Sequence, residues 1–121
     1  MEQHRDTFEK LFIRKEAKEV FKLVYRKFNN SNFRDYFFRD QILRSSLSIS
    51  NNIAEWHERQ TWKELIRFLY IAKGSAWETR NMILIGKDLW YFNKTEYEII
   101  LEKLNKVSGW LNNFIRRISN T

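Results

Sequence analysis

The sequence predicts an all-α protein, an antiparallel up-down-up-down four-helix bundle that forms one domain over residues 1–121. Apolar residues recur at steps of three and four along the chain, which is the period of amphipathic helices. Proline is absent and glycine occurs three times, so the many turns of an all-β domain are excluded. Three short polar breaks, at 29–32, 57–61 and 93–95, separate four helical segments.

The first two helices are expected over residues 7–28 and 33–56, with Ser31 or Asn32 as the N-cap of the second. The apolar stripe of the first helix is Ile13, Ala17, Val20, Val24 and Phe28. The apolar arc of the second helix is Tyr36, Ile42, Leu43, Ser46, Leu47, Ile49, Ile53 and Ala54.

The last two helices are expected over residues 62–90 and 96–118. Thr61 with Glu64, and Thr95 with Glu98, have the spacing of a capping box at the two N-termini. The stripe of the last helix is Tyr97, Leu101, Leu104, Ser108, Leu111, Ile115 and Ile118, with Ile100, Val107 and Phe114 alongside.

The third helix carries two apolar seams. The first seam is Trp62, Leu65, Leu69, Ala72, Ala76, Thr79, Ile83, Gly86 and Trp90. The second seam is Phe68, Ile71, Ser75, Glu78, Met82, Ile85 and Leu89. A wide stripe could contact both neighbouring helices of the bundle, or the second seam could pack against another subunit, and we favour the oligomer. The small residues Ala72, Gly74 and Ala76 would allow another backbone to approach closely.

The chain is basic, with a formal net charge of +7 and a pI near 9.8. A positive charge of this size favours polyanionic partners without proving that they bind. Five cations lie on one arc of the first helix: Arg14, Lys15, Lys18, Lys22 and Arg26. This arc is either a solvated face or a strip that contacts phosphates.

The second helix has a polar stripe, which is a solvated face, a hydrogen-bonded network within an assembly, or a binding surface. Its members are Gln41, Arg44, Ser48, Asn52 and Glu55. Aromatic and basic residues also gather at two helix ends, where they could stack bases or close off the core. These groups are Trp56, His57, Arg59, Trp62 and Lys63, and Trp90, Tyr91, Phe92 and Lys94.

Nothing in the sequence points to an enzyme. The two histidines, His4 and His57, form no Glu-x-x-His or His-Glu-x-x-His metal motif, and cysteine is absent. Isolated glycines do not make a phosphate-binding loop. We therefore expect no catalytic activity, no cofactor and no metal. The charged N-terminus lacks a signal-peptide core and no apolar run approaches the ~20 residues of a membrane span, so we expect a cytoplasmic protein without a membrane partner.

Two segments resemble a family of small four-helix bundle proteins, first noted as reading frames within intervening sequences of bacterial 23S rRNA genes. Residues 40–55, DQILRSSLSISNNIAE, are similar to the family's Gln-x-x-Arg followed by Ser-Ile-Pro-x-Asn-Ile-Ala-Glu-Gly. Residues 68–78, FLYIAKGSAWE, are similar to its Ala-x-Gly-Ser-x-x-Glu. Ser50 replaces the usual proline and Trp56 the usual glycine, and neither change alters the predicted fold.

The resemblance implies a homo-oligomeric ring, a pentamer in particular, and no established enzymatic activity. A relative, the accessory protein of diversity-generating retroelements, is a basic pentamer that works with a reverse transcriptase and nucleic acid. The family's motif positions are interpreted as structural or assembly residues, and they are Gln41, Arg44, Ser48, Asn52, Glu55, Gly74, Ser75 and Glu78.

We therefore expect a basic oligomeric scaffold that binds nucleic acid, RNA or DNA with structured RNA favoured, through the arc from Arg14 to Arg26. The alternative is an adaptor ring that docks a partner enzyme without binding nucleic acid directly. Salt dependence separates the two hypotheses, because phosphate binding weakens steeply with salt.

Overall fold

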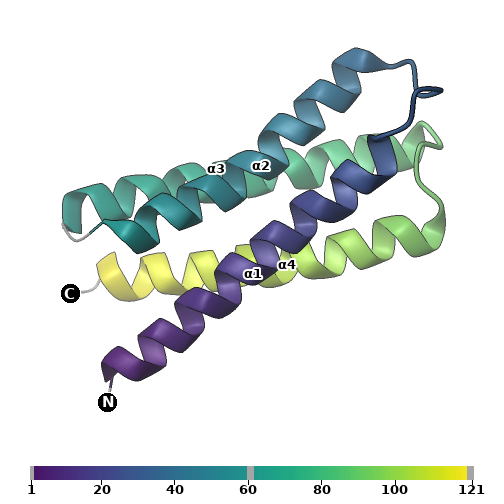
Figure 1. The fold of residues 1–121 in the computed structure, drawn as a ribbon. Helices are drawn as coiled ribbons and strands as arrows, with labels where there is room; N and C mark the ends of the chain where they lie inside the picture. Colours follow the sequence, from purple (N-terminus) through teal and green to yellow (C-terminus); the bar gives the residue numbers. More distant parts are fainter. Residues whose placement is uncertain (1, 60–61, 120–121) are drawn as a thin grey trace.

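The computed structural model describes residues 2–59 and 62–119, and these residues form an up-down-up-down four-helix bundle (Figure 1). The helices are α1 (Glu2–Phe28), α2 (Tyr36–Glu58), α3 (Trp62–Asp88) and α4 (Lys94–Ser119). Each described helix packs against two neighbours in the cyclic order α1, α2, α3, α4, and within the described residues the diagonal pairs meet through side chains rather than through close backbones. The predicted fold class is confirmed.

The apolar stripes predicted for α1 and α4 form the core. All five stripe residues of α1 are buried, and Leu104, Leu111, Ile115 and Ile118 of α4 are buried with them. The arc predicted for α2 is partly wrong, because Tyr36 and Leu47 are 53% and 40% exposed. Phe38, Ser45 and Trp56 are buried in α2 instead.

The helix starts differ from the predicted ones. The α2 helix begins at Tyr36, and Asp35 caps it by accepting a hydrogen bond from the Phe38 N–H at 3.1 Å. The prediction of Ser31 or Asn32 as N-cap is therefore wrong. Asn32 instead donates its N–H to the side chain of Asn30 at 2.9 Å, so this stretch forms a turn.

The capping box of α4 lies two residues earlier than predicted. The Glu96 N–H donates to Asn93 Oδ1 and the Asn93 N–H donates to Glu96 Oε1, both at 2.8 Å. Asn93, rather than Thr95, is therefore the N-cap, and Thr95 lies inside the first turn. The capping box predicted for Thr61 and Glu64 lies outside the residues whose side chains the structure describes.

The first seam of α3 is buried from Leu69 to Gly86, as predicted, but Trp90 is 90% exposed. The helix ends at Asp88, and Trp90 takes a left-handed conformation with φ 64°. The Trp90 N–H donates to the Lys87 carbonyl and the Tyr91 N–H to the Gly86 carbonyl, at 3.1 and 2.8 Å. This is a Schellman motif in which tryptophan occupies the position that glycine usually takes.

Aromatic rings fill both ends of the bundle. At one end Phe28 makes edge-to-face contacts with Phe33, Phe38 and Phe92, at centroid distances of 4.8, 5.7 and 5.4 Å. At the other end Trp56 packs on Trp110 and Phe114, at 5.5 and 5.0 Å. The core between them includes smaller side chains, namely Ala17, Ser45, Ser46, Ala72, Ala76 and Thr79.

Candidate functional site

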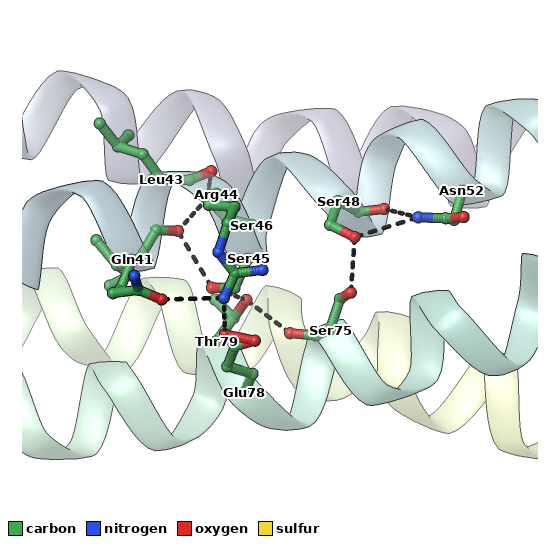
Figure 2. A network of polar contacts seen from close by, with 11 residues as sticks. Gln41, Leu43, Arg44, Ser45, Ser46, Ser48, Asn52, Ser75, Glu78 and Thr79 are labelled. Atoms are coloured by element: carbon green, nitrogen blue, oxygen red, sulfur yellow. Dashed lines mark hydrogen bonds and ion pairs between the residues drawn. The ribbon is translucent and has the colours of Figure 1, made fainter.

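The polar stripe of α2 faces α3, and most of the predicted motif residues bond to one another there (Figure 2). Arg44 Nη2 donates to Gln41 Oε1 at 3.0 Å and also to Glu78 Oε2 on α3. The Arg44 and Glu78 side chains are 57% and 40% exposed. This ion pair therefore lies at the surface, where it links α2 to α3 but adds little to stability.

One turn further along α2, Ser48 and Ser75 join the helices through their hydroxyls, at 2.8 Å (Figure 2). Asn52 Nδ2 donates to the Ser48 carbonyl at 2.8 Å and to its hydroxyl at 3.1 Å. A mid-helix asparagine that bonds back to the preceding turn explains how this poor helix former is accommodated. These hydrogen bonds all form within one chain, between α2 and α3 or within α2.

Beneath this surface lies a layer of fully buried hydroxyls. Thr79 Oγ1 lies 2.9 Å from Ser45 Oγ and 2.8 Å from the Ser75 carbonyl. Ser46 donates to the Ile42 carbonyl at 2.7 Å. Ser45 was missed by the sequence patterns, because a serine on a helix surface looks the same in sequence as one in a polar core.

Two of the motif residues do not join the network. Glu55 is exposed and pairs with Arg59 at 3.5 Å. Gly74 is also exposed, and a Cβ at this position would meet nothing within 4 Å. The sequence predicts that another backbone approaches Gly74 closely, but no other part of this chain does so among the described residues.

The structure separates Arg14 from the rest of the basic arc. Arg14 Nη1 lies 2.9 Å from His57 Nδ1 and 3.5 Å from Glu58, so Arg14 joins α1 to the end of α2. Burial, followed by the charges of Arg14 and Lys10, lowers the pKa of His57. Because a guanidinium can only donate, His57 Nδ1 accepts this hydrogen bond.

The other four cations of the arc are exposed on α1. Among the described residues, Lys22 pairs with Glu19 at 3.3 Å, whereas no ion pair forms at Lys15, Lys18 or Arg26. Lys15, Lys18, Lys22 and Arg26 are called the α1 basic row below.

The aromatic residues at the helix ends mostly close the core. Trp56 is fully buried and Phe92 is 4% exposed, so neither can stack a base. Tyr91 packs between Phe33 and Phe38 and donates its hydroxyl to Asp35 Oδ2 at 2.5 Å. This hydrogen bond raises the pKa of Tyr91 and lowers that of Asp35. The side chains of Trp62 and Lys63 lie outside the described part of the chain.

The described residues contain neither a metal-binding cluster nor a membrane-spanning helix. No group of three or more His, Asp or Glu side chains lies close enough to hold a metal ion. No helix in residues 2–59 and 62–119 combines the length and apolar character needed to span a membrane.

The sequence matches the family described as 23S rRNA-intervening sequence protein over residues 9–113. The fold is similar to a crystal structure of a protein with unknown function from the S23 ribosomal protein family of Bacteroides thetaiotaomicron. That chain is 24% identical, and the alignment covers 88% of this chain and 97% of that one, with a TM-score of 0.77. No curated protein is similar to the sequence.

Proposed function

Because the chain belongs to the 23S rRNA-intervening sequence protein family, we propose that it is a non-enzymatic, basic homo-oligomer that binds nucleic acid, with structured RNA favoured. The observation that carries the proposal is the α1 basic row. Its four exposed cations run along one helix and span about 16 Å at 1.5 Å per residue. Such a row fits a phosphate backbone and reads little sequence.

The acidic residues of α1 leave this row largely uncompensated. Glu16 turns towards α4, where its carboxylate lies 3.7 Å from Lys103. Glu9 likewise pairs with Arg117 of α4, at 3.2 Å. Since two carboxylates of α1 are engaged across the bundle, the surface of α1 keeps an excess of positive charge. A polyanion would gain from this excess through release of its counterions.

The second seam of α3 supports self-association into the proposed ring, a pentamer in particular. Ile71, Ile85 and Leu89 are 40%, 40% and 49% exposed, although they lie on one seam of a helix that already has a buried face. Exposed Gly74 lies three residues after Ile71 and leaves room for another backbone. Five copies would bring five times the charge of +7 onto one particle and strengthen attraction of a polyanion.

Fluorescence anisotropy of a labelled, structured RNA at several salt concentrations tests the proposal, with the particle mass fixed by light scattering in the same buffers. We expect an oligomer that binds the RNA tightly at low salt. The logarithm of its binding constant should fall linearly as the logarithm of the salt concentration rises. The variant Lys18→Glu with Lys22→Glu lowers the net charge from +7 to about +3 and should weaken binding and flatten the slope.

The matched control is Lys94→Glu with Lys106→Glu, which makes the same charge change on α4. Both lysines are exposed and each has a glutamate partner one turn away. If both variants weaken binding equally, the α1 basic row is not the site. A separate variant, Ile71→Lys with Ile85→Lys, should lower the measured mass if the second seam forms the subunit contact.

The exposed seam also favours the alternative function, an adaptor that docks a partner enzyme. An oligomer that binds RNA feebly at low salt would exclude the nucleic-acid proposal and leave the adaptor. Docking through an apolar surface should then be insensitive to salt, unlike binding to phosphates.

A further inference from the structure

A groove between α3 and α4 has a composition that neither seam of α3 nor the α1 basic row shares. It holds a shallow, open hollow of about 500 Å³. The residues that line it are Tyr70, Lys73 and Trp77 from α3, and Asn112, Ile115, Arg116 and Ser119 from α4. Tyr70 is 50% exposed and Trp77 is 56% exposed, so both rings are accessible.

The aromatic rings of the groove are regularly spaced along α3. Tyr70 and Trp77 are seven residues apart, which is two helical turns or about 10.5 Å on the same face. Lys73 lies between them, one turn from each. A third cation is close, because the Arg80 guanidinium lies 5.9 Å from the centroid of Trp77. The row thus alternates rings with positive charges.

The described part of the groove contains no carboxylate. Residues 103–119 of α4 contain no Asp or Glu at all. Residues 67–87 of α3 contain one acidic residue, Glu78, and it bonds to Arg44 on the α2 side of the helix. These two stretches therefore carry an excess of positive charge, with Lys73 and Arg116 at the hollow.

The groove offers little aliphatic surface to a protein partner. Ile115 is the aliphatic side chain among the lining residues, and it is 7% exposed. Protein helices that dock in grooves lay an apolar face against a hydrophobic floor. Flat aromatic rings flanked by cations are instead the surface on which unpaired bases stack while the backbone phosphates are neutralised.

We propose that the α3–α4 groove binds a single-stranded segment of nucleic acid, with bases stacked on Trp77 and Tyr70 and phosphates held by Lys73, Arg80 and Arg116. The inference rests on the proposed nucleic-acid function and assigns it a second, chemically distinct site. The α1 basic row contacts phosphates without regard to pairing. The groove selects unpaired bases, which structured RNA supplies in its loops and bulges.

The test compares a fluorescein-labelled 15-nucleotide oligothymidylate with a duplex of the same length, by anisotropy at several salt concentrations. Trp77→Ala should weaken binding of the single strand by about 5- to 100-fold, the range expected for loss of one stacked base. Duplex binding should stay unchanged. Trp77→Phe keeps a stacking ring and should restore most of the affinity. Phe37→Ala is the control, because it removes an exposed aromatic ring of α2 that does not line the groove.

Two further readouts keep the test decisive if Trp77→Ala folds poorly. Lys73→Ala should reduce the salt slope of single-strand binding by about one. A strand that carries 2-aminopurine should show fluorescence quenching on binding, and Tyr70→Phe should retain that quenching. Circular dichroism establishes that each variant is folded.

The failures of the two proposals are distinguishable. Wild-type single-strand affinity and wild-type quenching in folded Trp77→Ala would overturn the groove and leave the α1 basic row untouched. Equal loss of duplex and single-strand binding in that variant would also overturn it. Absence of salt-dependent binding to any nucleic acid by the wild-type protein would overturn both proposals together.

Discussion

The hydroxyl of Thr79 on α3 lies 2.9 Å from the hydroxyl of Ser45 on α2, and neither side chain is exposed to solvent. Thr79 also lies within 2.8 Å of the Ser75 carbonyl, so its single proton has two acceptors within reach. A shift of α3 along α2 by one turn would leave these buried hydroxyls with fewer partners. The pair therefore specifies the register of the two helices that carry the polar network.

Thr79→Val should destabilise the protein by about 1–2 kcal/mol, because it leaves Ser45 with one weak bond, to the Ile42 carbonyl at 3.3 Å. Ser45→Ala should cost a similar amount. The double variant should cost less than the sum of the two, because the two hydroxyls are partners. Urea unfolding of the four proteins measures this coupling, and strictly additive losses would show that the hydroxyls act independently.

Asn93→Ala should destabilise the protein by about 1 kcal/mol, since it removes the side-chain acceptor of the α4 N-cap. Thr95→Ala is the control, because Thr95 makes no cap and lies within the helix. We expect its effect on the free energy of unfolding to be small or slightly stabilising. If Thr95→Ala lowered the free energy of unfolding more than Asn93→Ala did, Thr95 would be the N-cap, as predicted from the sequence.

Glu96 should make stability depend on pH in the acid range. Burial opposes its ionisation, but the hydrogen bond from the Asn93 N–H and the pairing with Lys27 prevail and lower its pKa from 4.5. A carboxyl whose pKa is lower in the folded protein stabilises it above the ordinary pKa, and this contribution is lost as the pH falls. Glu96→Gln should therefore be less stable than wild type near pH 7. The difference in free energy of unfolding between the two proteins should disappear below about pH 4.5 in urea titrations. A difference that does not depend on pH would exclude the charge of Glu96 as its cause.

Trp90→Gly should stabilise the protein relative to Trp90→Ala by about 1 kcal/mol. Glycine adopts the left-handed φ of 64° without steric cost, whereas both tryptophan and alanine resist it. Because the Trp90 side chain is 90% exposed, its removal sacrifices little packing. Thermal unfolding of the three proteins tests this, and equal midpoints for the glycine and alanine variants would contradict it.

Gly86→Ala should destabilise the protein by about 1–3 kcal/mol, because its Cβ would lie 2.5 Å from Phe92 and 2.9 Å from Phe38. Both rings are nearly buried and cannot move aside freely. Gly74→Ala is the matched control, since it adds the same methyl group to the same helix in open space. We expect the control to be neutral or stabilising by up to ~1 kcal/mol at low protein concentration, where chains are monomeric. Equal effects of the two substitutions in urea unfolding would exclude overpacking.

The helices and their buried faces could be predicted because aliphatic residues at steps of three and four leave few alternatives. Helix starts could not, because Ser31, Asn32 and Asp35 all have side chains that can cap. The choice depends on where Phe28, Phe33 and Phe38 meet. These contacts join residues on both sides of the loop, so the apolar periodicity of either helix alone cannot predict them.

The polar stripe of α2 was recognisable, but its partners were not. Pairing of Arg44 with Glu78, or of Ser48 with Ser75, depends on the register between two helices, which no single-helix pattern contains. Tyr70 and Trp77 escaped notice for a related reason. Both lie off the two seams of α3, and their importance emerges only when α4 brings Arg116 beside them.

The distribution of tryptophans gives this bundle its own set of optical reporters. Trp56 is sealed at one end beside Trp110, Trp77 lies in the groove, and Trp90 stands in solvent at the far end of α3. Their emission should therefore be blue-shifted, intermediate and red-shifted in turn. If one end of the bundle unfolds before the other, the emission maximum of the tryptophan at that end should shift first. The order of these shifts therefore reports the order in which the two ends unfold.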